Sequence, residues 1–231
     1  NWQGLEWSQG PIECGEQGRT GLANVLPKDW AGSWILPIGG GWANRHAKSE
    51  LWADMNLHAA LALTSNPNRP ADEILCEWLS MNGFPEGSQE LLEKSPELIL
   101  RLRYLEVWRL IANQHWMPSE NWFRDDNFVP GACAKIANAV VENNMEDLLL
   151  SERALATSMA RSHLEIAESL PAFEHTDFVL ESYRWALRFA EWTEEMWAQL
   201  IDKAPLNRAQ CQTLLLHRLA DDPVPPLSVM D

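Results

Sequence analysis

The sequence lacks two features that would assign it to a membrane or to nucleic acid. No stretch approaches the roughly 18–20 uncharged apolar residues that a membrane helix requires, so we expect no membrane partner. Basic residues are scarce, because 18 Lys and Arg stand against 33 Asp and Glu, and the formal net charge is −15. Such an excess of negative charge repels a phosphate backbone, so we expect no nucleic-acid partner.

Metal-binding motifs are also missing. The four cysteines, Cys14, Cys76, Cys133 and Cys211, lie far apart with no CxxC pair, and the six histidines form no HxxxH or HExxH. This spacing argues against a metal site and against a dense disulfide framework, and it favours free, buried thiols. We therefore expect no metal and no cofactor.

The first residue is Asn, and the opening segment has neither the basic nor the apolar block of a signal peptide. We therefore expect that the chain is cut at its start. The compartment stays open between the cytoplasm and the periplasm of a bacterium.

Tryptophan is the abundant exception to these absences, with thirteen Trp against two Tyr. An indole ring brings a large apolar area and an N–H that needs a partner when it is buried. The commoner use of such rings is to fill a core, and the alternative is that a few of them stack on sugars. Composition alone does not separate the two uses.

Two short strand-like runs, at residues 5–8 and 33–38, stand near the start, and each leads into a glycine-containing loop. Two strands do not form a stable sheet by themselves, so these need partners from elsewhere. From about residue 48 the apolar spacing becomes helical and remains so. The expected helices cover residues 48–63, 70–83, 88–116 with an interruption at Pro96, 131–143, 146–170, 172–203 and 207–220.

Two of these helices carry long apolar stripes that we expect to face the core. On the first the stripe consists of Leu148, Leu155, Met159, Ile166 and Leu170. On the second it consists of Phe178, Trp185, Phe189, Trp192 and Met196. The chain is therefore expected to be mainly α-helical.

Three segments in succession resemble a known family. They are Gly32–Trp42 (GSWILPIGGGW), Glu50–His58 (ELWADMNLH) and Asn66–Trp78 (NPNRPADEILCEW). Their order resembles the last barrel strand and the start of the helical domain in glycoside hydrolase family 67, the α-glucuronidases and their relatives. Two further segments, Leu5–Gly18 and Asn121–Asp126, are similar to parts of the same family.

The resemblance implies a fold in two parts. Residues 1–65 would supply the last strands of an incomplete (β/α)8 TIM barrel, and residues 66–231 would form an all-helical C-terminal domain. In such a barrel the active site lies at the C-terminal ends of the strands. Glu6 would stand at the end of the penultimate strand, with Glu13 in the loop that follows.

Glycoside hydrolysis with inversion needs a carboxylic acid and a second carboxylate about 6.5–9.5 Å apart. The resemblance makes Glu6 the candidate base that activates water and Glu13 the second candidate, with the acid on an earlier strand outside this chain. The alternative is that Glu6 pairs with an arginine and Glu13 is a solvated loop residue.

The glycine loop would let the backbone pass close to a sugar, and Trp42 would stack on its face. Arg45 or His46 would meet a uronate carboxylate. The alternative is a tight turn with a buried Trp. The expected substrate-binding residues are Trp7, Trp34, Gly40, Trp42, Arg45 and His46.

The sequence thus predicts the C-terminal portion of an inverting hydrolase for an α-linked uronic acid, or a related sugar, of plant-type polysaccharide. Its expected partners are the carbohydrate substrate, the missing N-terminal part of the barrel and a second copy in a homodimer. The alternatives are a non-catalytic carbohydrate-binding module and a helical dimerisation module. We expect no hydrolysis by the isolated chain.

Overall fold

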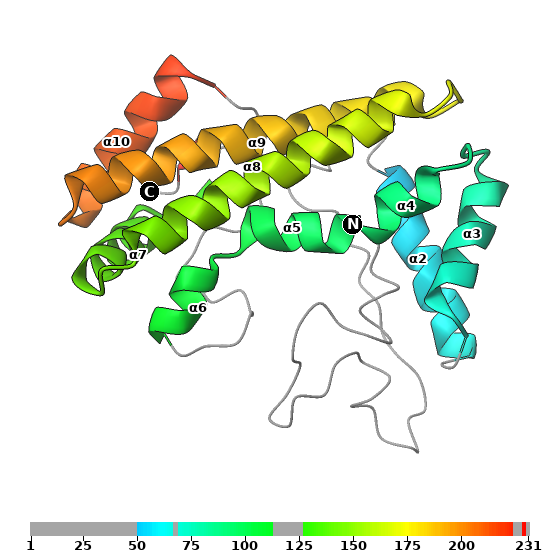
Figure 1. Ribbon diagram of the computed structural model, residues 1–231, viewed down its shortest axis with the longest axis horizontal. Coiled ribbons are helices and arrows are strands. Elements are labelled where there is room, and N and C mark those ends of the chain that lie inside the picture. Colours follow the sequence, from blue (N-terminus) through cyan, green and yellow to red (C-terminus); the bar gives the residue numbers. More distant parts are fainter. Residues whose placement is uncertain (1–49, 67–68, 113–126, 224–227, 230–231) are drawn as a thin grey trace. The chain divides into compact units, whose positions relative to one another are not determined.

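The computed structural model describes residues 50–66, 69–112, 127–223 and 228–229, and most of these residues are helical (Figure 1). The helices and strands in chain order are α2 (Glu50–Ser65), α3 (Ala71–Met81), α4 (Ser88–Glu93), α5 (Ser95–Arg103), α6 (Glu106–Ala112), β1 (Asn127–Phe128), α7 (Pro130–Glu142), α8 (Glu146–Ser169), α9 (Thr176–Lys203), α10 (Arg208–Asp221) and β2 (Ser228–Val229). The prediction of a mainly α-helical chain is confirmed for the described residues. The predicted strands at 5–8 and 33–38 lie outside them.

The chain divides into two compact units. The first comprises Asn1–Leu100 and His163–Ser182, and the second comprises Arg101–Ser162 and Tyr183–Asp231. Helices α5, α8 and α9 therefore contribute residues to both units. The boundary predicted between residues 1–65 and 66–231 stays a prediction.

The first unit has its core where α2 packs against α3 (Figure 1). Met55, Ala59 and Leu63 recur every four residues on α2, and each is at most 2% exposed. The face of α3 in this core is made of Ile74, Leu75, Trp78 and Leu79. Trp78 Nε1 donates a hydrogen bond of 2.8 Å to Asp54, so the indole ring is buried without leaving its N–H unpaired.

An aromatic cluster completes the first unit. The ring of Phe84, after α3, lies 4.8 Å from that of Phe173, and Trp52 on α2 lies 5.4 Å from Phe178 on α9. Trp52 Nε1 also donates to Ser182 Oγ at 3.2 Å. Aromatic pairs at these separations add about 0.5–1.5 kcal/mol beyond burial of their area.

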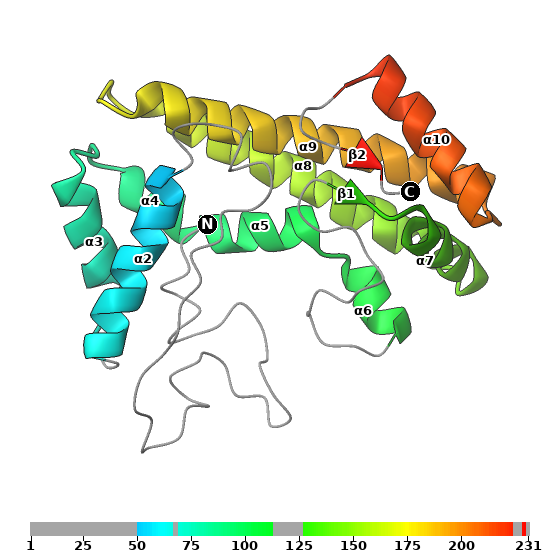
Figure 2. The ribbon, with the colours of Figure 1, turned by 180° about the vertical axis from the view of Figure 1, so that it is seen from behind.

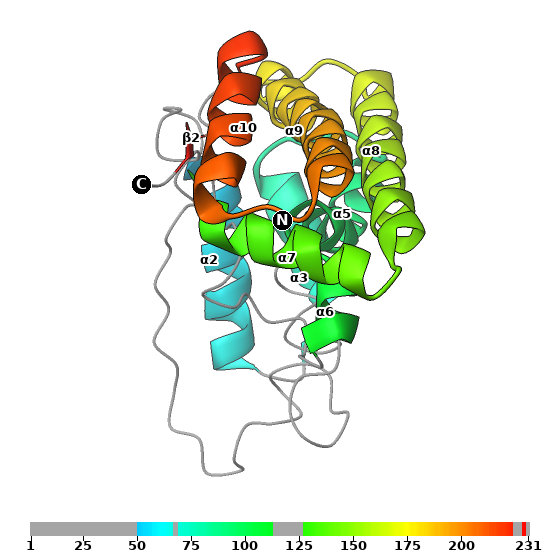
Figure 3. The same cartoon turned by 90° about the vertical axis from the view of Figure 1, so that its left-hand side faces the viewer.

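The second unit is built around α7, α10 and the parts of α8 and α9 that belong to it. Helix α7 lies against α10 (Figure 3). The two short strands pair in parallel, with Asn127 opposite Ser228 and Phe128 opposite Val229 (Figure 2). The largest fully buried side chains in this unit are Trp192, Trp197, Arg153, Phe128 and Phe189.

The prediction for the core face of α9 holds, whereas that for α8 is wrong. On α9, Phe178, Phe189, Trp192 and Met196 are buried, and Trp185 is half-buried and stacked on Phe189. On α8, Leu148 and Leu155 are 38% and 45% exposed. The residues that α8 buries are instead Leu149, Glu152, Arg153, Ala156, Thr157, Ala160, His163 and Ala167.

The segment predicted as one helix over residues 88–116 forms three helices in its described part. The first break falls at Lys94, two residues before Pro96, where the sequence predicted an interruption. The second falls at Tyr104 and Leu105, between α5 and α6, and was not predicted. Two side chains of α8, Glu152 and Arg153, contact the backbone at this second break.

Tryptophan fills the core in the part of the chain that the structure describes. Trp78, Trp108, Trp192 and Trp197 are buried. The other two described indoles, Trp52 and Trp185, are half-buried. For these six residues the core use is therefore the correct one.

Candidate functional site

The residues predicted to carry catalysis and sugar binding all lie outside the described residues. They are Glu6, Glu13, Trp7, Trp34, Gly40, Trp42, Arg45 and His46. Their roles therefore stay predictions. The candidate sites that follow belong to the second unit, and sequence reasoning had not singled them out.

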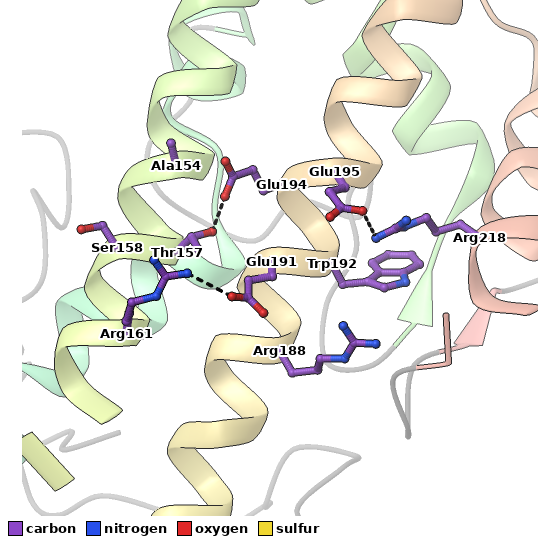
Figure 4. Close-up of a pocket in the computed structure, with 10 residues that line it drawn as sticks. All are labelled: Ala154, Thr157, Ser158, Arg161, Arg188, Glu191, Trp192, Glu194, Glu195 and Arg218. Carbon is purple, nitrogen blue, oxygen red and sulfur yellow. Dashed lines mark hydrogen bonds and ion pairs between the residues drawn. The ribbon is translucent and has the colours of Figure 1, made fainter. Parts of the chain in front are cut away.

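A pocket of about 430 Å³ opens in the second unit along the groove between α8 and α9 (Figure 4). It is lined by Ala154, Thr157, Ser158 and Arg161 of α8, by Arg188, Glu191, Trp192, Glu194 and Glu195 of α9, and by Arg218 of α10. On each long helix these residues recur at intervals of three and four, which places them on one face. A short connection between α8 and α9 makes the two helices antiparallel neighbours.

All three arginines of the pocket are ion-paired. Arg161 pairs with Glu191 at 3.1 Å, Arg188 pairs with Asp222, and Arg218 pairs with Glu195 at 2.5 Å. The dashed lines of Figure 4 show the pairs of Arg161 and Arg218. An acidic ligand would have to displace one of these carboxylates before it could form its own bidentate contact with a guanidinium.

Trp192 lines the pocket but has no free face for a sugar ring. Its indole is 0% exposed, and Phe128 stacks on it at 5.0 Å. The guanidinium of Arg218 lies 5.6 Å from the indole centroid, in a cation–π contact. Its Nε1 donates to the carbonyl of Asp222 at 3.1 Å. The indole therefore stabilises the packing of α9 against the end of α10.

A carboxylate of the pocket is also used between the helices. Thr157 Oγ1 donates to Glu194 Oε2 at 2.5 Å, which joins α8 to α9. Together with the three ion pairs, this hydrogen bond links α8, α9 and α10 through their polar side chains. Its geometry favours a structural role over sugar binding.

Glu152 is the described carboxyl whose chemistry departs most from that of an exposed side chain. It is 5% exposed, and its Oε2 accepts the backbone N–H groups of Glu106 at 2.8 Å and Val107 at 3.3 Å. Burial raises the pKa of this carboxyl to about 7, although Arg153 and the two amides favour the charged form. Its Oε1 is buried without a hydrogen-bond partner.

Arg153, the next residue, acts on the other side of the same break. It is 1% exposed, and its Nη2 donates to the carbonyls of Arg101 at 2.7 Å and Tyr104 at 2.9 Å. Burial lowers the pKa of this guanidinium to about 10, and the Glu152 carboxylate opposes that shift. The group remains charged at neutral pH.

Together the two side chains cap two helices at once. The carboxylate holds free N–H groups at the start of α6, where the helix dipole is positive. The guanidinium donates to two carbonyls at the end of α5, where the dipole is negative. Perturbed carboxyls mark many catalytic sites, but ion networks that support a fold perturb them as well. Glu152 does not line the pocket, so we assign it a structural role.

A signal for this pair was present in the sequence. Arg153 lies four residues after Leu149 and three before Ala156, so it falls on a helical face that those residues share. The neighbouring face, which carries Leu148 and Leu155, has the stronger apolar pattern. The sequence therefore predicts that the neighbouring face, rather than the face of Arg153, belongs to the core.

Two further findings concern the described residues alone. No group of three or more His, Cys, Asp or Glu side chains among them is arranged to hold a metal ion. None of their helices combines the length and the apolar character needed to cross a bilayer.

Comparison with models of known protein families gives no match, and neither curated proteins nor solved structures give a significant one. The function is therefore argued from the residues of this chain.

Proposed function

We propose that this chain is the C-terminal part of a glycoside hydrolase that releases an α-linked uronic acid, or a related sugar, with inversion. The observation that carries the proposal is the order of three segments, Gly32–Trp42, Glu50–His58 and Asn66–Trp78. In that order they resemble the passage from barrel to helical domain in the α-glucuronidases. A chance match of one short segment is common, whereas three in the same order are rarer.

The helices of the chain support this assignment. The second segment coincides with the start of α2, and the third contains the start of α3, which has Asp72 and Glu73 in its first turn. Both are helices in the resembling family as well. The helices that continue to Asp221 agree with a helical domain placed after a barrel.

The proposed reaction uses two carboxyl groups, one in this chain and one outside it. Glu6 activates a water molecule on one face of the sugar, with Glu13 as the second candidate for that role. A carboxylic acid from an earlier strand, outside this chain, protonates the leaving oxygen on the other face. Trp42 would stack on the sugar ring, and Arg45 would bind the uronate carboxylate through a bidentate contact.

The test uses glucuronidated xylo-oligosaccharides, with the chain assayed alone and together with the N-terminal barrel part that the proposal requires. We expect release of the uronic acid, and we expect Glu6→Gln to lower kcat by about 10²–10⁴-fold because it removes the general base. Glu16→Gln, in the loop that would follow Glu6 and that also carries Glu13, is the matched control and should leave kcat within a few-fold. Proton NMR of the first product should show the β-anomer.

Three outcomes would contradict the proposal in different ways. Unchanged release in Glu6→Gln would transfer the base to another residue, and Glu13→Gln would test the second candidate. An α-anomer as first product would exclude inversion. Binding of the oligosaccharide without release would support the alternative, a non-catalytic carbohydrate-binding module.

A further inference from the structure

The turn that ends α3 places an asparagine before a glycine at the surface of the first unit. Asn82 is the C-cap of α3, and Gly83 follows it with a φ of +65°. Asn82 is half-buried and Gly83 is exposed. A side chain at Gly83 would meet nothing within 4 Å, so the turn is open to solvent on this side.

Two backbone hydrogen bonds close this turn as a Schellman motif. The N–H of Phe84 donates to the carbonyl of Leu79 at 3.0 Å. The N–H of Gly83 donates to the carbonyl of Ser80 at 3.3 Å, which is long for an N–H···O hydrogen bond. The Gly83 amide is therefore held weakly, and it becomes free to react when the turn opens.

The end of α7 has the same geometry with a different second residue. Asn143 is the C-cap there, with φ and ψ of −99° and 3°, against −102° and 12° for Asn82. Asn143 Nδ2 donates to the carbonyl four residues earlier at 2.7 Å, and Asn82 Nδ2 does the same at 2.9 Å. Asn144 takes the place of Gly83, with a φ of +55°. The residue after the capping asparagine thus has a side chain at the end of α7 and none at the end of α3.

This difference decides whether the backbone can attack the asparagine. A peptide nitrogen reaches the side-chain carbonyl carbon of the preceding asparagine by closing a five-membered ring. A side chain on the residue that supplies the nitrogen hinders this approach, and glycine has none. We propose that Asn82–Gly83 is a site of deamidation and isomerisation, and that Asn143–Asn144 is not. This proposal does not depend on the proposed hydrolase function.

The reaction consumes one water molecule and releases one ammonia. The Gly83 nitrogen attacks Asn82 Cγ and forms a C–N bond. The bond from Cγ to Nδ2 breaks, and ammonia leaves with the proton that the Gly83 nitrogen gave up. Water then opens the resulting succinimide at either of its two C–N bonds. The product is aspartate or isoaspartate, in which the backbone runs through the former side chain, and no atom is oxidised or reduced.

Both products disturb the turn. A carboxylate in place of the Asn82 amide has no N–H to donate to the Trp78 carbonyl, and it places negative charge at the negative end of the α3 dipole. In isoaspartate the backbone also gains a methylene group, which changes the spacing that closes the Schellman motif. Phe84, which follows the turn, has its ring 5.2 Å from that of the buried Trp78. We therefore expect modification to loosen the packing of the first unit.

The experiment follows the full chain in mildly alkaline buffer by peptide mapping. Deamidation raises the mass of a peptide because OH replaces NH2, and electron-transfer fragmentation distinguishes isoaspartate from aspartate. We expect Asn82 to convert several-fold faster than Asn143, with isoaspartate among the products. The unfolding midpoint of the converted chain, followed by circular dichroism, should fall by about 2–8 °C, as for one lost interaction at a helix end.

Two variants separate the effect of the glycine from that of the charge. Gly83→Asn reproduces the turn of α7, and asparagine accepts a positive φ more readily than most residues with a side chain. We expect this variant to fold, as checked by circular dichroism, and to convert Asn82 several-fold more slowly. Asn82→Asp supplies the charge without the isoaspartate linkage, so its unfolding midpoint should fall by less than that of the converted chain.

Three results would overturn the proposal. The first is an Asn82 amide that stays intact in the folded chain over the time in which the urea-unfolded chain converts, because the turn would then protect it. The second is conversion of Asn82 and Asn143 at equal rates. The third is conversion of Asn82 in Gly83→Asn at the rate of the unsubstituted chain.

Discussion

Glu152 is the residue whose titration bears most directly on stability. Its pKa rises from the usual value near 4.5 to about 7 in the folded chain. A carboxyl with a raised pKa binds its proton more tightly when folded, so its contribution to stability is present below pH 4.5. That contribution is lost as the pH rises to about 7. The loss is roughly 3 kcal/mol at most, since one pKa unit corresponds to about 1.4 kcal/mol.

Glu152→Gln should remove this dependence on pH while keeping an oxygen that accepts from Glu106 and Val107. We expect the free energy of unfolding of the native chain, relative to the variant, to fall between pH 4.5 and 7.5. Urea unfolding at several pH values measures it. Glu165→Gln, at an exposed position on the same helix, is the control. It should change the free energy of unfolding by the same amount at pH 4.5 and at pH 7.5. A flat difference for Glu152→Gln would show that the folded carboxyl titrates normally.

At the scale of an element, α8 shows how a helix selects its buried face. Leucine and isoleucine recur on one face, but the buried face carries mostly small and polar residues. Alanines such as Ala156 and Ala160 let neighbouring helices approach closely. The ends of α5 and α6 supply hydrogen-bond partners that offset the cost of burying Arg153 and Glu152. These partners are not visible in the apolar pattern of α8 alone.

Adjacent leucines at the start of α8 test this assignment with the same substitution. Leu149 is 0% exposed and Leu148 is 38% exposed. We expect Leu149→Ala to lower the free energy of unfolding by about 2–5 kcal/mol, because it removes buried methyl groups and leaves a cavity. Leu148→Ala should change it by less than about 1 kcal/mol. Urea unfolding measures both losses. A larger loss for Leu148→Ala than for Leu149→Ala would show that the face predicted from the sequence is the buried one.

At the scale of the whole molecule, the acidic net charge is the sequence property that we expect to affect stability. The formal net charge of −15 implies self-repulsion in the compact state, which opposes folding. The Debye length, over which salt screens charges from one another, shortens from about 30 Å at 10 mM salt to about 10 Å at 100 mM. We therefore expect the unfolding midpoint at pH 7 to rise by a few degrees over this range of sodium chloride, as followed by circular dichroism.

The matched condition is the same titration near pH 5, where partial protonation of the carboxyl groups reduces the net charge. The rise in the midpoint should become smaller there. An equal rise at both pH values would mean that salt acts by some means other than screening of the acidic excess.

The helical elements were predictable because each depends on local pattern. Apolar spacing of three and four residues, an acidic first turn at Asp72 and Glu73, and proline after Asn66 mark the limits of α2 and α3. The core face of α9 was also predictable, because its aromatic rings recur at helical spacing and their large apolar area favours burial.

The candidate sites were not predictable in the same way. The capping of two helices by Glu152 and Arg153 joins residues far apart in sequence, so no window of sequence contains it. The catalytic and sugar-binding residues predicted from the family resemblance lie outside the described residues and rest on the sequence.

The sequence by itself determined the helical class, most helix limits and the acidic charge, because each of these is a local or summed property. Tertiary structure decided which face of α8 is buried and where the chain breaks between α5 and α6. These features follow from contacts between distant segments. Their free energy depends on a partner that the local sequence does not specify.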